Sequence, residues 1–471
     1  MSFCCGKGDI GYKTPQDAIN GPKEKVIFMT CVNVNKGGHD MIVTVDVDRK
    51  STSYGEIIGR CVLPYENDEI HHTGWNTCSS CFGQNNLSRS HLIVPCLGTS
   101  RIYAINVADP RNLIVDKIVE PETLSKFNVT FPHTSHCLAD GNIMISTLGD
   151  NDYNNRGNFI LLDGKTFVPK ETWIDSTSTE PAFNYDFWYQ PRINTMISTE
   201  WGNPNNIKSG FSLADVGEGK YGNNITVFNW KEKTVRQTLK LEGPEGYLPL
   251  EVRFLHEPSS YHAFIGTGLG SAMYHIHAPK EDGVFQADMV HAFKPKKVQN
   301  WILPEMPALV TDIIISMSDK YLYASCWLHG SIKQFDISDP NNIRLIGSVF
   351  IGGLLHKKTG IKVVDDSEMT EQPEQLVVKG KAVEGGPQML QLSLDGKRLY
   401  VTTSLYSHWD KQFFPKMYEQ GSSMLTVDVG DDGKMSVNND FHLTFNDLEN
   451  GPFLAHEMRY ENGDCTSDIW I

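Results

Sequence analysis

RIYAINVAD, residues 101–109, is a strand-sized run of β-branched and aromatic residues that ends in turn residues, and the chain repeats its pattern. The copies of this run are MIVTVDVD (41–48), RIYAINVAD (101–109), NFILLDGKT (158–166), NITVFNWKE (224–232), AMYHIHAPK (272–280), SIKQFDISD (331–339) and SMLTVDVGD (423–431). A pattern that recurs across the whole chain indicates one repeat architecture rather than several unrelated domains.

Each copy follows another short apolar run, such as KVIFMTCV (25–32) or KRLYVTTSLYS (397–407). Further upstream lies a run that ends in turn residues, as in LQLSLDGK (390–397). A charged turn and a return strand follow each copy, which gives four short antiparallel strands per repeat. This pattern, repeated seven times, predicts an all-β fold, namely a seven-bladed β-propeller.

The two ends of the chain complete each other in this prediction. Residues 455–471 stop after one strand and the start of another, whereas residues 25–47 begin as though strands were missing before them. A blade shared by both ends would close the ring and remove open strand edges. We therefore predict a tail over 1–24 and a single propeller over 25–471. Uneven repeat spacing places loop inserts near 202–222, 352–386 and 406–422, and the aromatics of the last could form a lid.

Composition narrows the classes of partner. The chain has 471 residues and a formal net charge of −15, which argues against nucleic acid or an anionic membrane as the main partner. No apolar stretch is long enough for an integral membrane segment, and the N-terminus has no signal-peptide core. We expect a cytosolic location with reduced cysteines; nuclear or peripheral membrane association stays open.

The starts of the innermost strands should converge on the central channel, although they are far apart in sequence. The aligned strands are HHTGWNTC (71–78), HTSHCLAD (133–140), YDFWYQPR (185–192), LEVRFLHE (250–257), TDIIISMS (311–318), GPQMLQLS (386–393) and AHEMRYEN (455–462). At or beside the first position stand His71, His72, His133, Asp186, Glu251, Asp312, Gln388 and His456. Imidazoles or carboxylates stand in six of the seven blades, so we expect one shared polar site.

The histidines of this register predict a metal site. The candidate ligands are His71, His72, His133, His136 and His456. Imidazole nitrogen suits copper, zinc, iron or nickel, and the neighbouring side chains of Asp186, Glu251, Asp312 and Gln388 could orient the ligands by accepting their N–H groups. Adjacent residues of a regular strand point to opposite faces, so only a bend would let both His71 and His72 bind. The alternative is a polar channel that binds only water.

Cys78 and Cys81 form a single CxxC pair. A structural zinc site would need a second pair, which the sequence lacks. Redox chemistry, selenium or soft-metal binding, and an inert pair on a loop all stay open. Cys137 should pack as a small hydrophobe, and His256 and His329 should make hydrogen bonds in turns or in the core.

Long strings of rare residue types carry a resemblance to a known family. The stretches are HHTGWNTCSSCFG (71–83), FPHTSHCLADG (131–141), YDFWYQPR (185–192), LPLEVRFLH (248–256), EGGPQMLQLSLDGKRLYVTTSLYSHWDKQFFP (384–415) and AHEMRYENGDCTSDIWI (455–471). In these motifs the chain closely resembles the selenium-binding protein family, also called methanethiol oxidases. The likeness runs from GYKTPQDAINGP (11–22) to the last residue.

The resemblance implies oxidation of methanethiol, a small thiol substrate, by O2 and water to formaldehyde, hydrogen sulfide and hydrogen peroxide, with copper as cofactor. It also implies selenium binding at a cysteine. Gly55 stands where some members carry Cys, so Cys78 and Cys81 are the remaining selenium candidates.

In this reading Glu251 or Asp312 is the general base, and an apolar wall comes from Trp75, Phe187, Trp188 and Trp201. The alternatives to an oxidase are a selenium-binding or scaffold propeller without turnover and a metal-dependent hydrolase.

Overall fold

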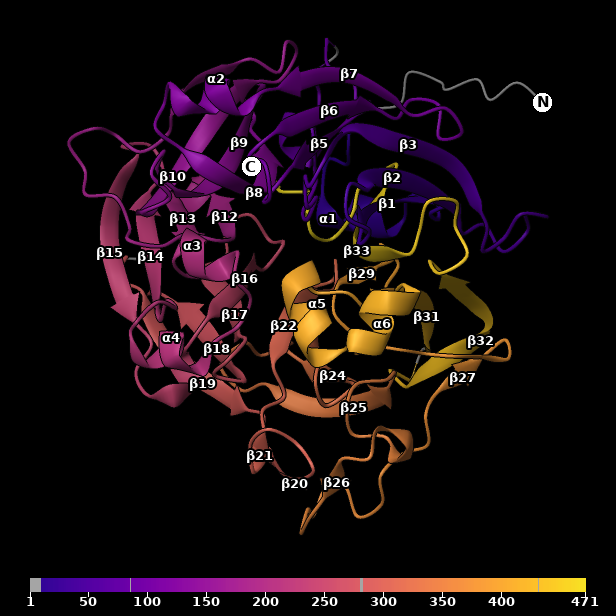
Figure 1. Ribbon diagram of the computed structural model, residues 1–471. Helices are drawn as coiled ribbons and strands as arrows, with labels where there is room; N and C mark the ends of the chain where they lie inside the picture. Colours follow the sequence, from indigo (N-terminus) through magenta and orange to yellow (C-terminus); the bar gives the residue numbers. More distant parts are fainter. Residues whose placement is uncertain (1–9, 85, 280–282, 431) are drawn as a thin grey trace.

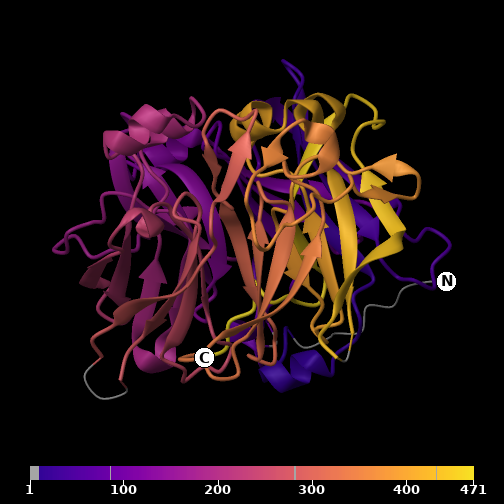
Figure 2. The same ribbon diagram turned by 90° about the horizontal axis from the view of Figure 1, so that it is seen from below.

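Strands dominate the computed structural model, which describes residues 10–84, 86–279, 283–430 and 432–471. Within these residues the strands form seven antiparallel sheets of four strands each, with two smaller sheets beside them. Figure 1 shows the large sheets arranged around a common centre, and Figure 2 shows them standing side by side in one layer. The predicted all-β fold is confirmed, and the arrangement is propeller-like.

Within each sheet the strands are given from the centre outward. The first sheet comprises β4 (Gly74–Trp75), β5 (His91–Pro95), β6 (Ile102–Asn106) and β7 (Ile114–Val119), and the second comprises β8 (Thr130–Cys137), β9 (Asn142–Gly149), β10 (Asn155–Asp163) and β11 (Pro169–Thr172). The third comprises β12 (Phe187–Gln190), β13 (Thr195–Ser198), β14 (Asn224–Asn229) and β15 (Thr234–Lys240), and the fourth comprises β16 (Pro249–Phe254), β17 (His262–Thr267), β18 (Ala272–His277) and β19 (Gln286–Ala292). The other three comprise β22 (Val310–Ile315), β23 (Tyr321–Cys326), β24 (Ser331–Asp336) and β25 (Arg344–Phe350); β29 (Leu390–Leu392), β30 (Arg398–Thr402), β31 (Ser423–Val429) and β32 (Met435–Thr444); β33 (Phe453–Tyr460), β1 (Val26–Asn33), β2 (His39–Asp46) and β3 (Ile57–Glu66).

The repeated run of the sequence has one structural role. Each of its seven copies contributes the third strand of a large sheet, as β2, β6, β10, β14, β18, β24 and β31. The copies are rich in buried apolar residues because this strand is covered on both faces by the neighbouring sheets. The two ends of the chain meet in one sheet, where β33 pairs antiparallel with β1 and Ile27 lies opposite Tyr460.

The predicted inserts carry four of the short α-helices that the structure describes, one 3-10 helix and three strands of the small sheets. These are α3 (Pro204–Ile207), α4 (Leu213–Gly217), η4 (Lys357–Thr359), β26 (Lys362–Val363), β27 (Val377–Val378), β28 (Lys381–Ala382), α5 (Ser407–Phe413) and α6 (Pro415–Gln420). Outside the inserts lie α1 (Pro15–Ile19), η1 (Ser79–Cys81), α2 (Pro121–Ser125), η2 (Pro191–Ile193), η3 (Pro244–Gly246), β20 (Lys296–Gln299) and β21 (Glu305–Met306). Figure 2 shows α3 to α6 on one face of the molecule, with α1 and the C-terminus on the other.

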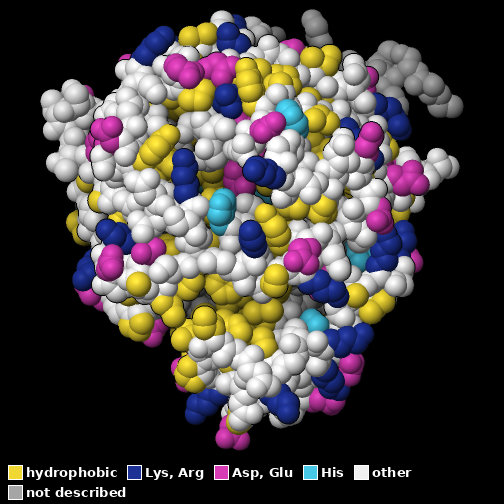
Figure 3. All heavy atoms as spheres, in the orientation of Figure 1, with side chains coloured by type: hydrophobic (Ala, Val, Ile, Leu, Met, Phe, Trp, Pro, Cys, Tyr) yellow, Lys and Arg dark blue, Asp and Glu magenta, His cyan; other side chains and the backbone are white. Residues whose placement is uncertain are grey.

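The charged side chains of one face and the lengths of the helices can be described directly. Basic and acidic side chains are interspersed over the face shown in Figure 3, and neither sign forms a continuous field there. None of the helices that the structure describes has the length and apolarity needed to cross a bilayer.

Buried hydroxyl groups tie neighbouring sheets together near the centre. Thr30 of β1 donates to the carbonyl of His71 at 3.2 Å, and Ser146 of β9 donates to the carbonyl of Tyr185 at 2.6 Å. Thr402 of β30 donates to the carbonyl of His456 at 2.8 Å. In each case a side chain of a second strand binds the backbone near the start of the next sheet's innermost strand. These bonds fix the residues that face the centre.

Replacing Thr30 with valine tests this role. Thr30 also accepts a hydrogen bond from the backbone N–H of Glu457 at 3.0 Å, so Thr30→Val leaves a buried N–H and a buried carbonyl without their partner. We expect the free energy of unfolding, measured by urea denaturation, to fall by about 1–3 kcal/mol. Thr44→Val is the matched control, because the Thr44 hydroxyl is buried and has no hydrogen-bond partner. An equal loss in both variants would contradict the assignment.

Candidate metal centre

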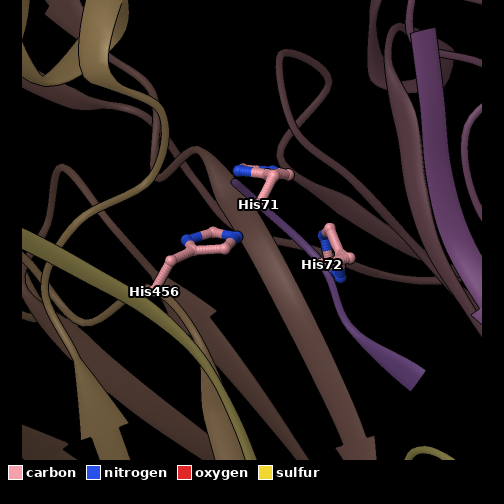
Figure 4. Close-up of side chains that lie close together, drawn as sticks. All are labelled: His71, His72 and His456. Atoms are coloured by element: carbon pink, nitrogen blue, oxygen red, sulfur yellow. The ribbon is translucent and has the colours of Figure 1, made fainter. Parts of the chain in front are cut away.

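Three histidines from two separate parts of the chain meet at the centre. One ring nitrogen each of His71, His72 and His456 lies within 4.8 Å of the others, and all three side chains are buried (Figure 4). The rings of His71 and His456 stack with their centres 3.9 Å apart. The ring of His133 joins them, with its centre 4.3 Å from that of His72 and 5.2 Å from that of His71. We call these residues the four-imidazole cluster.

The backbone at His71 and His72 departs from a regular strand, which allows both side chains to face the same side. Both residues precede the short strand β4, and the only pairing just before them is an isolated bridge from Ile70 to Cys96. The segment is therefore not a regular strand, and both rings turn toward His456, with their centres 4.7 Å apart. His133 lies where the pairing of β8 with β9 changes register, between Pro132 and Ser135.

Free nitrogens distinguish this cluster from an ordinary group of core histidines. The Nε2 atoms of all four rings are buried and have no hydrogen-bond partner in the described structure. His72 instead donates from Nδ1 to Glu457 Oε1 at 3.0 Å, and His456 donates from Nδ1 to the Ser404 carbonyl at 2.9 Å. A histidine bonded in this way presents the lone pair of Nε2, which is the form that binds a metal.

Electrostatics keep these imidazoles neutral. Burial lowers the pKa of His71, His72 and His133 well below the usual value, and it lowers the pKa of His456 to about 3. The other imidazoles lower the pKa of His71, His133 and His456 further, and Arg459 and Arg253 do so for His72, because a second positive charge close by is unfavourable. Neutral imidazoles suit copper, zinc, iron or nickel, so the donor set fits such an ion.

His136 stands apart from the four-imidazole cluster. Its ring packs at right angles to the rings of Phe187 and Trp188, with centres 5.0 and 5.4 Å away. Burial lowers its pKa to about 3, and its Nδ1 has no hydrogen-bond partner in the described structure. The predicted fifth ligand is therefore placed against aromatic residues of β12 rather than in stacking contact with the other four rings.

Glu251 and Asp312 are buried beside the cluster. Glu251 Oε1 lies 3.8 Å from His72 Nε2 and has no hydrogen-bond partner in the described structure, whereas Oε2 accepts a bond from Arg253 at 2.6 Å. Asp312 accepts from the Leu390 N–H at 2.7 Å through one oxygen, and its other oxygen lies 3.8 Å from Arg253 Nη2 and has no hydrogen-bond partner in the described structure. Burial raises the pKa of Glu251 well above its usual value and that of Asp312 to about 7. A carboxyl group with the pKa of Asp312 can exchange protons near neutral pH.

Asp186 and Gln388 do not hold the imidazoles in the described contacts. Asp186 accepts hydrogen bonds from Arg253 Nη1 at 2.7 Å and from the Val252 N–H at 2.9 Å. Gln388 is buried, its N–H donates to Thr402, and its side-chain oxygen has no partner in the described structure. Asp186 therefore positions the arginine beside Glu251.

The carboxylate that binds a cluster imidazole is Glu457, which was not among the predicted residues. Besides binding His72, Glu457 accepts from the N–H of Thr73 and from Arg459 Nη2 at 2.6 Å. A signal for it exists, because Glu-x-Arg occurs in both β16 and β33. Residues two apart in a strand share a face, so each carboxylate comes with its own arginine.

Aromatic rings enclose the cluster on the helical side. Trp201 and Tyr406 lie 6.4 and 6.2 Å from His71, and they contact each other at 5.4 Å between ring centres. Tyr406 immediately precedes α5, where Asp410 accepts from the Ser404 hydroxyl at 2.6 Å. Figure 1 shows α5 and α6 lying over the centre. Of the predicted wall, Trp201 lies at the cluster, Phe187 and Trp188 lie at His136, and Trp75 packs against Phe28 instead.

The other singled-out residues lie elsewhere. Cys78 and Cys81 are buried around η1 and make no contact with the four imidazoles in the described structure. His256 bonds to Asp319 at 2.9 Å and His329 to the Met306 carbonyl at 3.0 Å, which confirms their expected hydrogen-bonding roles. Gly55 has a φ of 81°, a backbone conformation that favours glycine over cysteine.

Comparison with known proteins gives a consistent result. The family model of the 56 kDa selenium-binding proteins matches residues 6–471. Proteins named methanethiol oxidase from Homo sapiens and selenium-binding protein 2 from Mus musculus are each 49% identical to this chain over 100% of both chains. The crystal structure of a hypothetical selenium-binding protein from Sulfolobus tokodaii has 33% identity and a TM-score of 0.87 and covers 98% of each chain. The chain belongs to the family of 56 kDa selenium-binding proteins.

Proposed function

We propose that this protein is a methanethiol oxidase, an oxidoreductase that converts methanethiol, O2 and water to formaldehyde, hydrogen sulfide and hydrogen peroxide. Full-length relatives at 49% identity that bear this name support the proposal. The observation that carries it is the four-imidazole cluster, because four buried Nε2 atoms without a partner are costly unless an ion binds them.

We also infer that the seven large sheets are the blades of one closed propeller over residues 25–471, with 1–24 as a tail. The pairing of β33 with β1 supports closure, since it joins the two ends of the chain in one sheet. The cytosolic location and the lack of a nucleic-acid partner stay predictions from composition.

In this proposal copper would be held by His71, His72, His133 and His456. His136 lies outside the four-imidazole cluster and is the candidate for a fifth donor. When bound, copper supplies a redox couple for O2 and acts as a Lewis acid toward the thiol. The neutral state of the imidazoles favours binding, because no proton has to leave them first. Selenium attachment remains a separate prediction for Cys78 or Cys81.

The residues around the cluster supply proton transfer and shape. Glu251 is the proposed general base, because its Oε1 lies 3.8 Å from His72 Nε2 and has no hydrogen-bond partner among the described residues. Asp312 is the second candidate. Trp201 and Tyr406 exclude bulk water and leave an apolar surface for a methyl group.

Removal of a cluster histidine should abolish both metal binding and turnover. In His456→Ala we expect copper content after reconstitution, measured by mass spectrometry, to fall and methanethiol oxidation to drop by about 100-fold or more. Sulfide and peroxide should form in equal amounts in the wild type and disappear together in the variant. His262→Gln, at a half-buried histidine outside the cluster, is the control. Undiminished turnover in His456→Ala would overturn the proposed site.

Glu457→Gln tests the carboxylate that positions His72. The amide can still accept one hydrogen bond but lacks the charge that raises the basicity of the imidazole. We expect copper affinity, measured by competition with a chelator, to weaken by about 10–100-fold. Glu180→Gln changes a carboxylate that binds Arg156 elsewhere and should leave the affinity unchanged. Equal affinities of wild type and Glu457→Gln would show that this carboxylate serves the fold alone.

Glu251→Gln separates proton transfer from metal binding. Copper content should stay at the wild-type level, whereas kcat for methanethiol should fall by about 10²–10⁴-fold. Asp312→Asn, measured in the same assay, distinguishes the two candidate bases, since the true base should show the larger loss. If both variants keep full kcat, neither carboxyl group is the base.

A further inference from the structure

Three cysteines outside the four-imidazole cluster meet around one serine hydroxyl. Ser80 Oγ lies 3.2 Å from Cys78 Sγ, 3.8 Å from Cys81 Sγ and 3.7 Å from Cys137 Sγ. The first two thiols flank and end η1, whereas Cys137 is the last residue of β8. Cys78 and Cys81 form a motif in the sequence, whereas the proximity of Cys137 to them is seen only in the folded structure.

Both Cys78 and Cys81 hydrogen-bond to the Cys137 thiol, and Cys81 also contacts the backbone at the end of β8. Cys81 donates a hydrogen bond to the carbonyl of Leu138 at 3.4 Å, so its thiol lies directly against the end of β8. A hydrogen bond from the Cys137 thiol is the main cause that lowers the pKa of Cys81 to about 7, and Arg89 adds a smaller effect of the same sign. At neutral pH a large fraction of Cys81 is therefore thiolate, the form that reacts with oxidants.

The remaining thiols differ. Burial raises the pKa of Cys31, Cys96 and Cys465 well above the usual value, and it raises that of Cys326 to about 12. Those cysteines are inert small residues of the core. Cys81 is thus distinguished both by a partner thiol and by its ionisation.

The three thiols are buried, but the chain just after Cys81 reaches the surface among the described residues. Phe82, the residue after Cys81, is 38% exposed, and a Cβ added at Gly83 would meet nothing within 4 Å. On the other side Tyr12 donates its N–H to Ser79 at 3.0 Å. Hydrogen peroxide is small, so we expect it to reach Cys81 from the side of Phe82.

We infer that Cys81 and Cys137 form an oxidation site, in which hydrogen peroxide joins the two thiols in a disulfide. The Cys81 sulfur attacks one peroxide oxygen, the O–O bond breaks, and a sulfenic acid forms with release of one water. The Cys137 sulfur then attacks the Cys81 sulfur, the S–O bond breaks, and the second water leaves as the S–S bond forms. Two thiols lose two electrons in total, and one peroxide gains them.

This site goes beyond the proposed oxidase activity and does not depend on it. Hydrogen peroxide is a product of that reaction, yet any source of peroxide serves. Cys137 and His133 lie on one strand, four residues or about 13 Å apart. The thiols can therefore be changed without removing a histidine.

Peptide mapping of the full-length protein after treatment with hydrogen peroxide tests the inference. We expect a non-reducing digest to contain a Cys81–Cys137 cross-linked peptide pair, which dithiothreitol separates. Cys81→Ser and Cys137→Ser should each lose this product, and the rate of thiol loss should fall at least about tenfold. Cys78→Ser should retain it, as should Cys326→Ser, the control for a buried cysteine elsewhere.

The digest of the wild-type protein tests the proposed disulfide even if a variant folds poorly. Absence of any cross-link at Cys81, or a bond between Cys78 and Cys81 as the main product, would overturn the inference. Copper content of the wild type before and after treatment gives a second measurement, and it should stay unchanged because the four imidazoles are not consumed.

Discussion

The hydroxyl of Thr30 binds two backbone groups that belong to different sheets, and the geometry of the centre depends on it. It accepts from the N–H of Glu457 and donates to the carbonyl of His71. The carboxylate of Glu457 then reaches back to the N–H of Thr73 and to the ring of His72. Two side chains thereby set the position of the segment that carries two histidines against the strand that carries the third. Without Thr30 and Glu457, no side-chain hydrogen bond in the described structure would fix His71 and His72 relative to the strand of His456.

Burial of charge is the second constraint, because the carboxylates beside the histidines are taken out of water. Each has an arginine two residues along the same strand, Arg253 for Glu251 and Arg459 for Glu457. A paired carboxylate costs less to bury than an isolated one. The pairing is incomplete on one side, since Glu251 Oε1 has no partner among the described atoms. A buried carboxylate oxygen without a hydrogen bond beside the cluster suits proton transfer better than structural support.

Much of the fold could be predicted from the sequence, and the site only in part. The repeated run identified the third strand of each large sheet, because a strand buried on both faces has a strong apolar pattern. The histidines were found because the innermost strands start at a common register. The position of His136 and the joint use of His71 and His72 were not predictable. They depend on irregular backbone, where the two-residue period no longer fixes the direction of a side chain.

Strand β8 carries residues of both the proposed metal site and the proposed oxidation site. His133 near its middle faces the other imidazoles, whereas Cys137 at its end faces η1. His136 and Cys137 are neighbours, and alternate residues of a strand point to opposite faces, so the imidazole meets β12 while the thiol meets Ser80. Soft sulfur ligands would otherwise compete with imidazole for copper. The alternation of the strand keeps thiols that can be oxidised close to the centre and outside its reach.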